Sequence, residues 1–164
     1  MDMLMSRRSI RKFKSTSVTE EQIKIMLHAA MMAPSAVNGQ PWQFIVCDDR
    51  RIIDEIIKHQ PYARSLETAP LCVVVCGDEG NIKGYYQQDC AAATQNLMLA
   101  AYELGLGTCW MGVAPRPDRM DPVREQFALP ESVMPFCLIA VGVPDEVPAQ
   151  PERWKEEKVH RNSW

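Results

Sequence analysis

The stretch that decides the fold is Leu71-Cys72-Val73-Val74-Val75-Cys76, in the run from Ala69 to Gly77. Its uninterrupted apolar and β-branched character predicts a strand that is buried on both faces. Pro135 to Val143 has the same character and predicts a second buried strand. Gln43 to Cys47, closed by two aspartates, predicts a third strand.

Helical patterns lie between these strands. Thr19 and Gln22 have the spacing of a capping box, and they precede an apolar face made of Ile23, Met26, Leu27, Ala30 and Met31. A short amphipathic helix is predicted over 50–59, with Ile52, Ile53, Ile56 and Ile57 turned inward. The alanine-rich segment 85–104 predicts a central helix that another helix or a second subunit can approach closely. A brief helix is predicted to start at Asp121-Pro122 and to end at Ala128. Helices and strands intermix, which indicates an α+β or α/β core.

The bulk composition limits the class of protein. The chain has 164 residues, 46% of them hydrophobic and 24% charged, and a formal net charge of -3. These values predict one domain over residues 1–164 and argue against general nucleic-acid binding. Residues 1–14 contain no apolar core of a secretory signal, and no run has the length of a membrane span. We therefore expect a cytoplasmic protein that binds no membrane.

The six cysteines form no C-x-x-C pair, and most of them lie within apolar runs. This favours buried free thiols over disulfides or zinc. His28, His59 and His160 lie far apart and show no metal-ligand spacing, so we expect no metal site.

A basic stretch, Ser6-Arg7-Arg8-Ser9-Ile10-Arg11-Lys12-Phe13-Lys14, runs against the global charge. Five cations within eight residues suggest a bound anion, whereas the alternative is a solvated N-terminal arm. The arginines can offer forked donors to a phosphate, which lysine cannot.

No motif for a phosphate loop, a dinucleotide fold or a nucleophile elbow is present, and Asp89 is expected on a helix surface. What remains is a set of binding groups. Asn38 and Gln40 carry amides that suit the edge of a heteroaromatic ring, and Arg153 and Lys155 add late positive charge. Together with the basic stretch, they predict a planar, phosphate-bearing cofactor that supplies the reactive atoms.

Four segments resemble the nitroreductase family of FMN-dependent oxidoreductases, and they occur in family order. They are Arg7-Arg8-Ser9-Ile10-Arg11, Pro34-Ser35-Ala36-Val37-Asn38-Gly39-Gln40-Pro41-Trp42, Gly105-Leu106-Gly107-Thr108-Cys109-Trp110-Met111-Gly112, and Val159-His160-Arg161-Asn162-Ser163-Trp164. The resemblance implies an α+β fold with a central, mainly antiparallel sheet flanked by helices. It also implies an intertwined homodimer with FMN at the subunit interface.

By position in these motifs, the resemblance assigns three groups of cofactor-binding residues. The phosphate, the ribityl chain and the N1/O2 edge of the ring would be held by Arg7, Arg8, Ser9 and Arg11. Contacts with FMN, from the partner subunit, would come from Ala36, Asn38 and Gln40. The ring would be approached by the backbone of Met111 and Gly112, and the phosphate pocket would be completed by Arg153 and Lys155.

The implied activity is transfer of a hydride from NADH or NADPH, through flavin N5, to a nitroaromatic, quinone or similar acceptor. No side chain is assigned a catalytic role, because the cofactor carries the reacting atoms. Two alternatives use the same binding residues. They are another flavin chemistry, such as dehalogenation or a flavin-consuming reaction, and an FMN-binding module without enzymatic activity.

Overall fold

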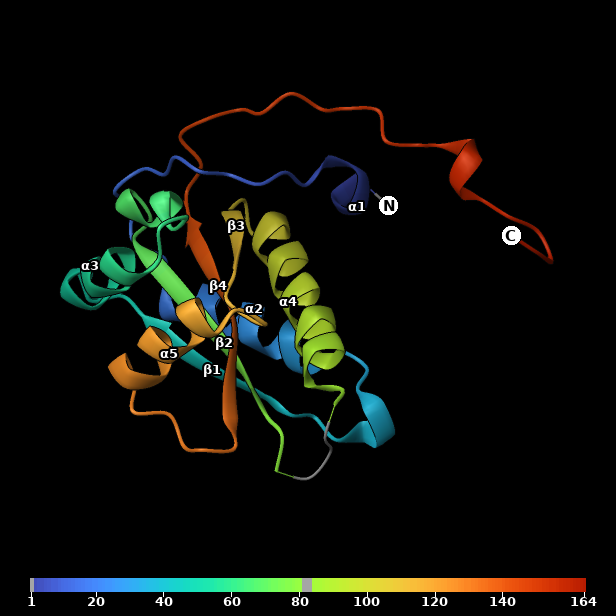
Figure 1. Cartoon of the computed structure of the whole chain (residues 1–164). Coiled ribbons are helices and arrows are strands. Elements are labelled where there is room, and N and C mark those ends of the chain that lie inside the picture. The colour runs from blue at the N-terminus through green and yellow to red at the C-terminus, as the bar shows by residue number, and fades with distance from the viewer. Residues whose placement is uncertain (1, 81–83) are drawn as a thin grey trace.

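The computed structural model describes residues 2–80 and 84–164, and this part of the chain contains one four-stranded sheet (Figure 1). The strands are β1 (Trp42–Cys47), β2 (Leu71–Asp78), β3 (Gly107–Gly112) and β4 (Val133–Gly142), in the order β1-β2-β4-β3. All neighbouring strands run antiparallel. The α+β class and the antiparallel sheet that the family resemblance implied are therefore confirmed.

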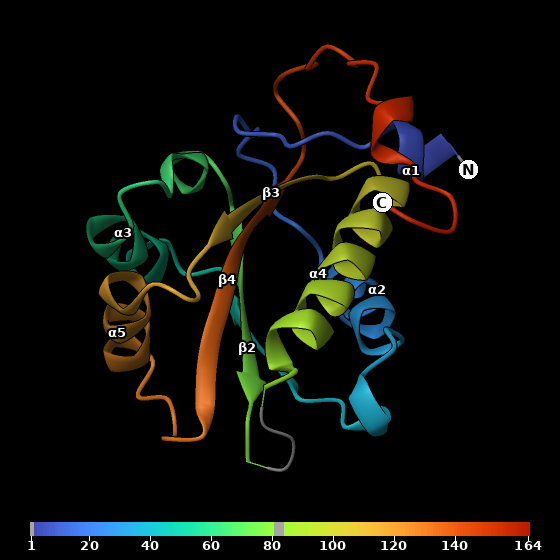
Figure 2. The same ribbon diagram turned by 45° about the vertical axis from the view of Figure 1, so that its right-hand side comes forward.

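Helices cover both faces of the sheet. The α-helices of the described residues are α1 (Asp2–Ser6), α2 (Glu20–Met31), α3 (Arg50–His59), α4 (Tyr86–Glu103) and α5 (Pro117–Gln126). Short 3₁₀ turns are η1 (Ala36–Asn38), η2 (Arg64–Glu67) and η3 (Glu156–Lys158). The pair α2 and α4 lies on one side of the sheet, and the pair α3 and α5 lies on the other (Figure 2).

The burial of β2 explains why its sequence is apolar throughout. Cys72, Val74 and Cys76 point into the core under α3 and α5. The alternating residues, such as Val73 and Val75, point into the core under α2 and α4. Every residue from Leu71 to Cys76 is at most 1% exposed. Because successive side chains point to opposite faces, a strand with two covered faces requires an apolar residue at every position.

The long helix α4 packs closely against α2, as its small residues predicted. Ala93 and Ala101 of α4 and Ala30 of α2 are completely buried. The Asn96 side chain donates a hydrogen bond of 3.1 Å to the backbone oxygen of Ala29 in α2. The neighbour of this helix is therefore another helix of the same chain.

The expected capping box is present at the start of α2. Thr19 accepts from the backbone N–H of Gln22, whose side chain in turn accepts from the Thr19 N–H at 3.0 Å.

Gly105 follows the C-terminal end of α4. It has a φ of 74°, which glycine adopts at a helix end without steric cost.

Some details of the sequence prediction are wrong. The helix expected from Asp121 begins at Pro117, which takes the favoured first helical position, and Pro122 therefore lies inside α5. Ile52 of α3 and Met31 of α2 were placed on buried faces, but they are 39% and 49% exposed. A helix buries a narrower stripe than the full apolar pattern when only one neighbouring layer covers it.

All six cysteines are buried and free. Burial raises the pKa of the Cys47 thiol to about 11 and that of Cys90 to about 12. These thiols therefore stay protonated at neutral pH and belong to the apolar core. Among the residues that the structure describes, no helix has the length and apolar character to cross a membrane.

Candidate functional site

The basic N-terminal segment is held against the ends of β3 and β4. Ser9 forms a parallel bridge with Thr108, and Phe13 forms an antiparallel bridge with Pro144. The Ile10 N–H donates to the Thr108 oxygen at 2.9 Å. The alternative of a frayed, solvated arm is therefore wrong for this segment, because its backbone is paired and Ile10 and Phe13 are buried.

Two glycines allow the segment to approach the sheet so closely. A Cβ at Gly107 would lie 2.6 Å from Ile10, and a Cβ at Gly142 would lie 3.0 Å from Phe13. A side chain at Gly107 would therefore push Ile10 and the N-terminal segment away, whereas a side chain at Gly142 would first meet Pro70, at 2.6 Å, and would press on Phe13 less severely. In the Gly-Leu-Gly stretch after α4, Gly105 thus ends the helix, and Gly107 lets the N-terminal segment that carries the arginines pack against β3.

Arg7, Arg8 and Arg153 bring three positive charges together. Burial, the charge of Arg153 and the charge of Arg8 lower the pKa of Arg7. Within the described residues, none of the three forms an ion pair with a carboxylate. Cations that converge without a counter-ion repel one another, and a bound anion would relieve that repulsion. The cluster therefore has the electrostatics of an anion site.

Buried polar atoms without partners lie beside this cluster. Arg8 donates through Nη1 to the backbone oxygens of Met5 and Arg7, at 3.0 and 2.6 Å, but its Nε has no partner among the described residues. Thr108 Oγ1 is also buried and unpartnered within the described part of the chain. Unpaired buried donors are unfavourable, so these atoms fit a polar ligand.

A cavity of about 640 Å³ lies next to the same residues, between the N-terminal segment and the chain that follows β4. Its lining includes Arg7, Arg8, Gly107, Thr108 and Gln150, and the carboxylates of Glu103 and Glu146. Its volume falls within the range of small-molecule sites in proteins, roughly 300–1,000 Å³.

Arg11 faces a second cavity, of about 840 Å³, that also contains Tyr62, Ser65 and Cys109. The backbone N–H of Arg11 donates to a carboxylate oxygen of Glu146, and the Arg11 side chain is exposed. At the inner side of this region, the Ser65 hydroxyl donates to the sulfur of Met111 at 3.1 Å. The structure therefore places Arg11 and the Arg7–Arg8 pair at two different cavities.

Gly112 ends β3 with free space around its Cα, since a Cβ there would meet nothing within 4 Å. Its carbonyl oxygen accepts from Arg119 at 3.1 Å, and the Arg119 guanidinium lies 4.7 Å from the centre of the Tyr62 ring. The open face of this glycine is consistent with approach of a flat ring, while the carbonyl is already occupied.

The residues from Ser35 to Gln40, which we call the amide loop, adopt an unusual backbone. Val37, Asn38 and Gln40 have φ values of 46°, 57° and 47°. Such left-handed conformations cost roughly 1–3 kcal/mol each for residues other than glycine, and a β-branched residue is a clear outlier there. The Gln40 side chain donates to the Asn38 Oδ1 at 2.9 Å, so the two amides are held together.

Asp89 lies under this loop, and its expected position on a helix surface is wrong. It is 6% exposed, and its Oδ1 accepts from the Ala36 N–H at 3.0 Å. The sequence did contain a signal for this burial. Asp89 is three residues after Tyr86 and four before Ala93, which places it on the buried stripe of α4.

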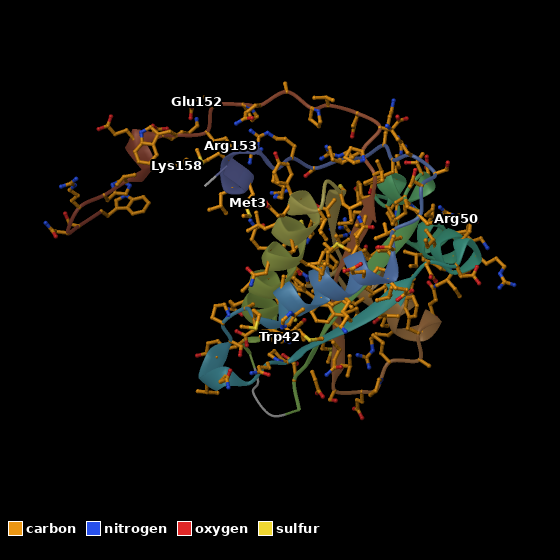
Figure 3. The ribbon with its side chains drawn as sticks, turned by 180° about the vertical axis from the view of Figure 1, so that it is seen from behind. Met3, Trp42, Arg50, Glu152, Arg153 and Lys158 are labelled. Carbon is orange, nitrogen blue, oxygen red and sulfur yellow. The ribbon has the colours of Figure 1, made fainter. Side chains whose placement is uncertain are left out.

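The C-terminal tail is exposed from residue 151 to 164, including Trp154 and Trp164. Arg153 lies near α1, on the side of Met3 (Figure 3), and its positive charge acts on Arg7. Lys155 lies 4.0 Å from Glu157 and does not join the arginine cluster. The tail therefore brings the charge of Arg153 close to Arg7, while Lys155 faces Glu157.

The two groups of predicted residues lie at opposite ends of α4. The amide loop is tied to the first turn of this helix, and the arginine cluster lies beyond its last turn (Figures 1 and 2). A helix of 18 residues is about 27 Å long. In one copy of the chain, Asn38 and Gln40 are thus too far from Arg7 to share a ligand.

Comparison with known proteins agrees with this architecture. The Nitroreductase family model matches residues 4–65 and 60–143. A protein of Methanothermobacter thermautotrophicus, with the provisional name NADH dehydrogenase/NAD(P)H nitroreductase, is 40% identical over 100% of this chain and 87% of its own length.

Solved structures give the same result. A protein from Parabacteroides distasonis with the same provisional name has a TM-score of 0.96 and 37% identity, over 99% of this chain and 97% of that one. An FMN-dependent nitroreductase from Clostridium difficile has a TM-score of 0.93 and 31% identity, over 99% and 98%. The chain therefore belongs to the nitroreductase family of oxidoreductases.

Proposed function

We propose that this protein binds FMN in a composite site made by two copies of the chain, and uses it to oxidise NADH or NADPH. One copy would contribute Arg7, Arg8, Ser9 and Arg153 to the phosphate and ribityl chain. The other copy would contribute the amide loop. The observation that carries the proposal is the cavity lined by Arg7, Arg8 and Thr108, in which the Arg8 Nε and the Thr108 hydroxyl are buried without a partner among the described residues.

The residues present fit FMN in several respects. The arginine cluster needs an anion, and the unpartnered Arg8 Nε and Thr108 Oγ1 need polar partners. The paired amides of Asn38 and Gln40 can donate and accept at the edge of a ring, and the open face of Gly112 leaves room for one. The similarity to the Clostridium difficile protein, which is named FMN-dependent, supports this choice of cofactor.

Bound in this site, FMN would supply the redox chemistry, in which a hydride passes from the nicotinamide to flavin N5 and then to a nitroaromatic, quinone or similar acceptor. The protein's own residues would bind and orient. Arg11, set apart from the phosphate cluster, would face the N1/O2 edge and stabilise negative charge there. We assign no side chain an acid–base role, since water can supply protons.

Exposure of the tail supports the second copy. Trp154 and Trp164 are 72% and 100% exposed, and Val159 is 54% exposed. Apolar groups of this size in one segment need a surface to cover them. We propose that the tail lies across the partner and so helps to complete the same dimer.

A mixed dimer tests the composite site. One chain carries Arg7→Ala with an intact amide loop, and the other carries Asn38→Ala and Gln40→Ala with an intact Arg7, each with a different affinity tag. If one site combines Arg7 of one copy with the loop of the other, the mixed dimer has one intact site and one doubly damaged site. It should therefore bind one FMN tightly per two chains, whereas both homodimers bind weakly. Two equally weakened sites in the mixed dimer would overturn the proposal.

A further inference from the structure

The carboxylate of Asp89 is buried at a high cost for little compensation. It lies in the first turn of α4 and is 6% exposed. Oδ1 accepts one hydrogen bond, from the Ala36 N–H, while Oδ2 is buried and has no partner among the described residues. Burying a carboxylate with a single hydrogen bond is unfavourable compared with an apolar side chain of the same shape. An acid in the first turn of a helix is stabilised by the helix dipole, which offsets part of this cost. The hydrogen bond to Ala36 is the specific contact that an acid makes here.

The single hydrogen bond of Asp89 connects the amide loop to the helix scaffold. Within the described part of the chain, the other hydrogen bonds of residues 35–40 stay inside the loop. Three are donated by the backbone, from the Gln40 N–H to the Ser35 hydroxyl at 3.0 Å, from the Gly39 N–H to the Ala36 oxygen at 2.8 Å, and from the Asn38 N–H to the Ser35 oxygen at 3.1 Å. The fourth joins the side chains of Gln40 and Asn38 at 2.9 Å. These bonds give the loop a shape but do not place it on the molecule.

We infer that Asp89 is a positioning residue, which holds the Ala36 N–H so that the strained amide loop is presented in its binding conformation. It acts through Asn38 and Gln40 and does not itself contact the cofactor. A loop that is ordered before binding loses less conformational entropy when the ligand arrives, and so binds more tightly. This inference rests on the proposed function, because it assigns the ordered loop to FMN.

Two variants of similar size separate the hydrogen bond from the space that the side chain fills. Asp89→Leu removes the acceptor, whereas Asp89→Asn keeps an oxygen that can accept from Ala36. We expect Asp89→Leu to weaken FMN binding about tenfold, and Asp89→Asn to weaken it no more than about threefold. The measurement is a titration of the apoprotein with FMN, followed by quenching of flavin fluorescence.

Thr94→Val is the matched control. Thr94 is fully buried on the same helix, and its hydroxyl contacts the Cys137 sulfur at 3.6 Å, away from the loop. This variant should lower the melting temperature while FMN affinity stays within about twofold of the parent, because the amide loop is untouched. Wild-type FMN affinity in a folded Asp89→Leu protein would overturn the inference, as would an equal loss of affinity in Thr94→Val.

Hydrogen exchange of the Ala36 amide in the wild-type apoprotein gives a readout that needs neither FMN nor a destabilised variant. The amide should exchange much more slowly than in an unstructured peptide, and Asp89→Asn should retain most of that protection. Exchange at the peptide rate in the wild-type protein would show that Asp89 does not hold the loop. If the wild-type protein fails to bind FMN but the Ala36 amide is protected, the proposed function fails and the positioning of the loop stands.

Discussion

The two candidate binding regions differ in which energy term is unfavourable in the absence of a ligand. The arginine cluster at one end of α4 keeps three cations together, and none of them forms an ion pair with a carboxylate of the described residues. The amide loop at the other end keeps three residues in left-handed conformations. Repulsion is the unfavourable term in the first region, and backbone strain is the unfavourable term in the second.

The difference indicates what each region recognises. Unpaired positive charge favours any anion of suitable size and gives affinity that depends on salt. A strained loop with fixed amides favours a ligand edge of defined geometry and depends little on salt. One region is thus suited to a phosphate and the other to a ring, and the following experiments distinguish the two.

The largest expected effect comes from Arg7→Ala. It should weaken FMN binding roughly tenfold to a hundredfold, because a hydrogen bond to a charged group is lost, and leave riboflavin, which has no phosphate, nearly unaffected. Titrations with both flavins at low and high salt measure this. Arg51→Ala, at an exposed arginine of α3 paired with Asp49, is the charge control. An equal loss for riboflavin would show that Arg7 does not contact the phosphate.

Asn38→Ala should have a smaller effect of a different kind. Loss of a neutral hydrogen bond predicts FMN binding that is about threefold to tenfold weaker. The loss should be the same for riboflavin and should not change with salt concentration, because the amide contacts the ring. The same flavin titrations measure it, and a loss confined to FMN would contradict the division of roles.

Val37→Asn tests whether the amide loop is strained. Asparagine tolerates a positive φ better than valine, and Val37 is 87% exposed, so little packing is lost. The free energy of unfolding should rise by about 1 kcal/mol in denaturant titrations. Val147→Asn, at a valine that is 98% exposed and has an ordinary φ, should leave stability unchanged. A rise in both variants would show that exposure, and not strain, is the cause.

The last prediction concerns a thiol in the core under α3 and α5, away from both binding regions. Burial raises the pKa of the Cys47 thiol from 9.0 to about 11. Between these values the unfolded chain loses the thiol proton while the folded protein keeps it, so stability falls as pH rises above about 9. Melting temperatures should therefore decline from pH 8 to pH 10.5, and less steeply in Cys47→Ala. Equal slopes in the two proteins would show that Cys47 does not contribute.

Local patterns were good predictors wherever one physical requirement dominates. The capping box at Thr19 depends on residues only three apart, and it is present. The apolar run of β2 allows no other placement than a strand covered on both sides. The start of α5 was predicted wrongly because two prolines, Pro117 and Pro122, offer competing helix starts, and the earlier one was taken.

From the sequence, periodicity indicated a core of mixed helices and strands, because it depends on local spacing, and the resemblance of four short motifs implied the family and its antiparallel α+β sheet. Tertiary structure alone decided which of the predicted site residues meet. The length of α4 separates the amide loop from the arginines, while the tail brings Arg153 back to Arg7. The tertiary structure also decided the partner of the Asp89 carboxylate, because the position of Asp89 on the buried stripe of α4 does not reveal that the Ala36 N–H of the amide loop meets it.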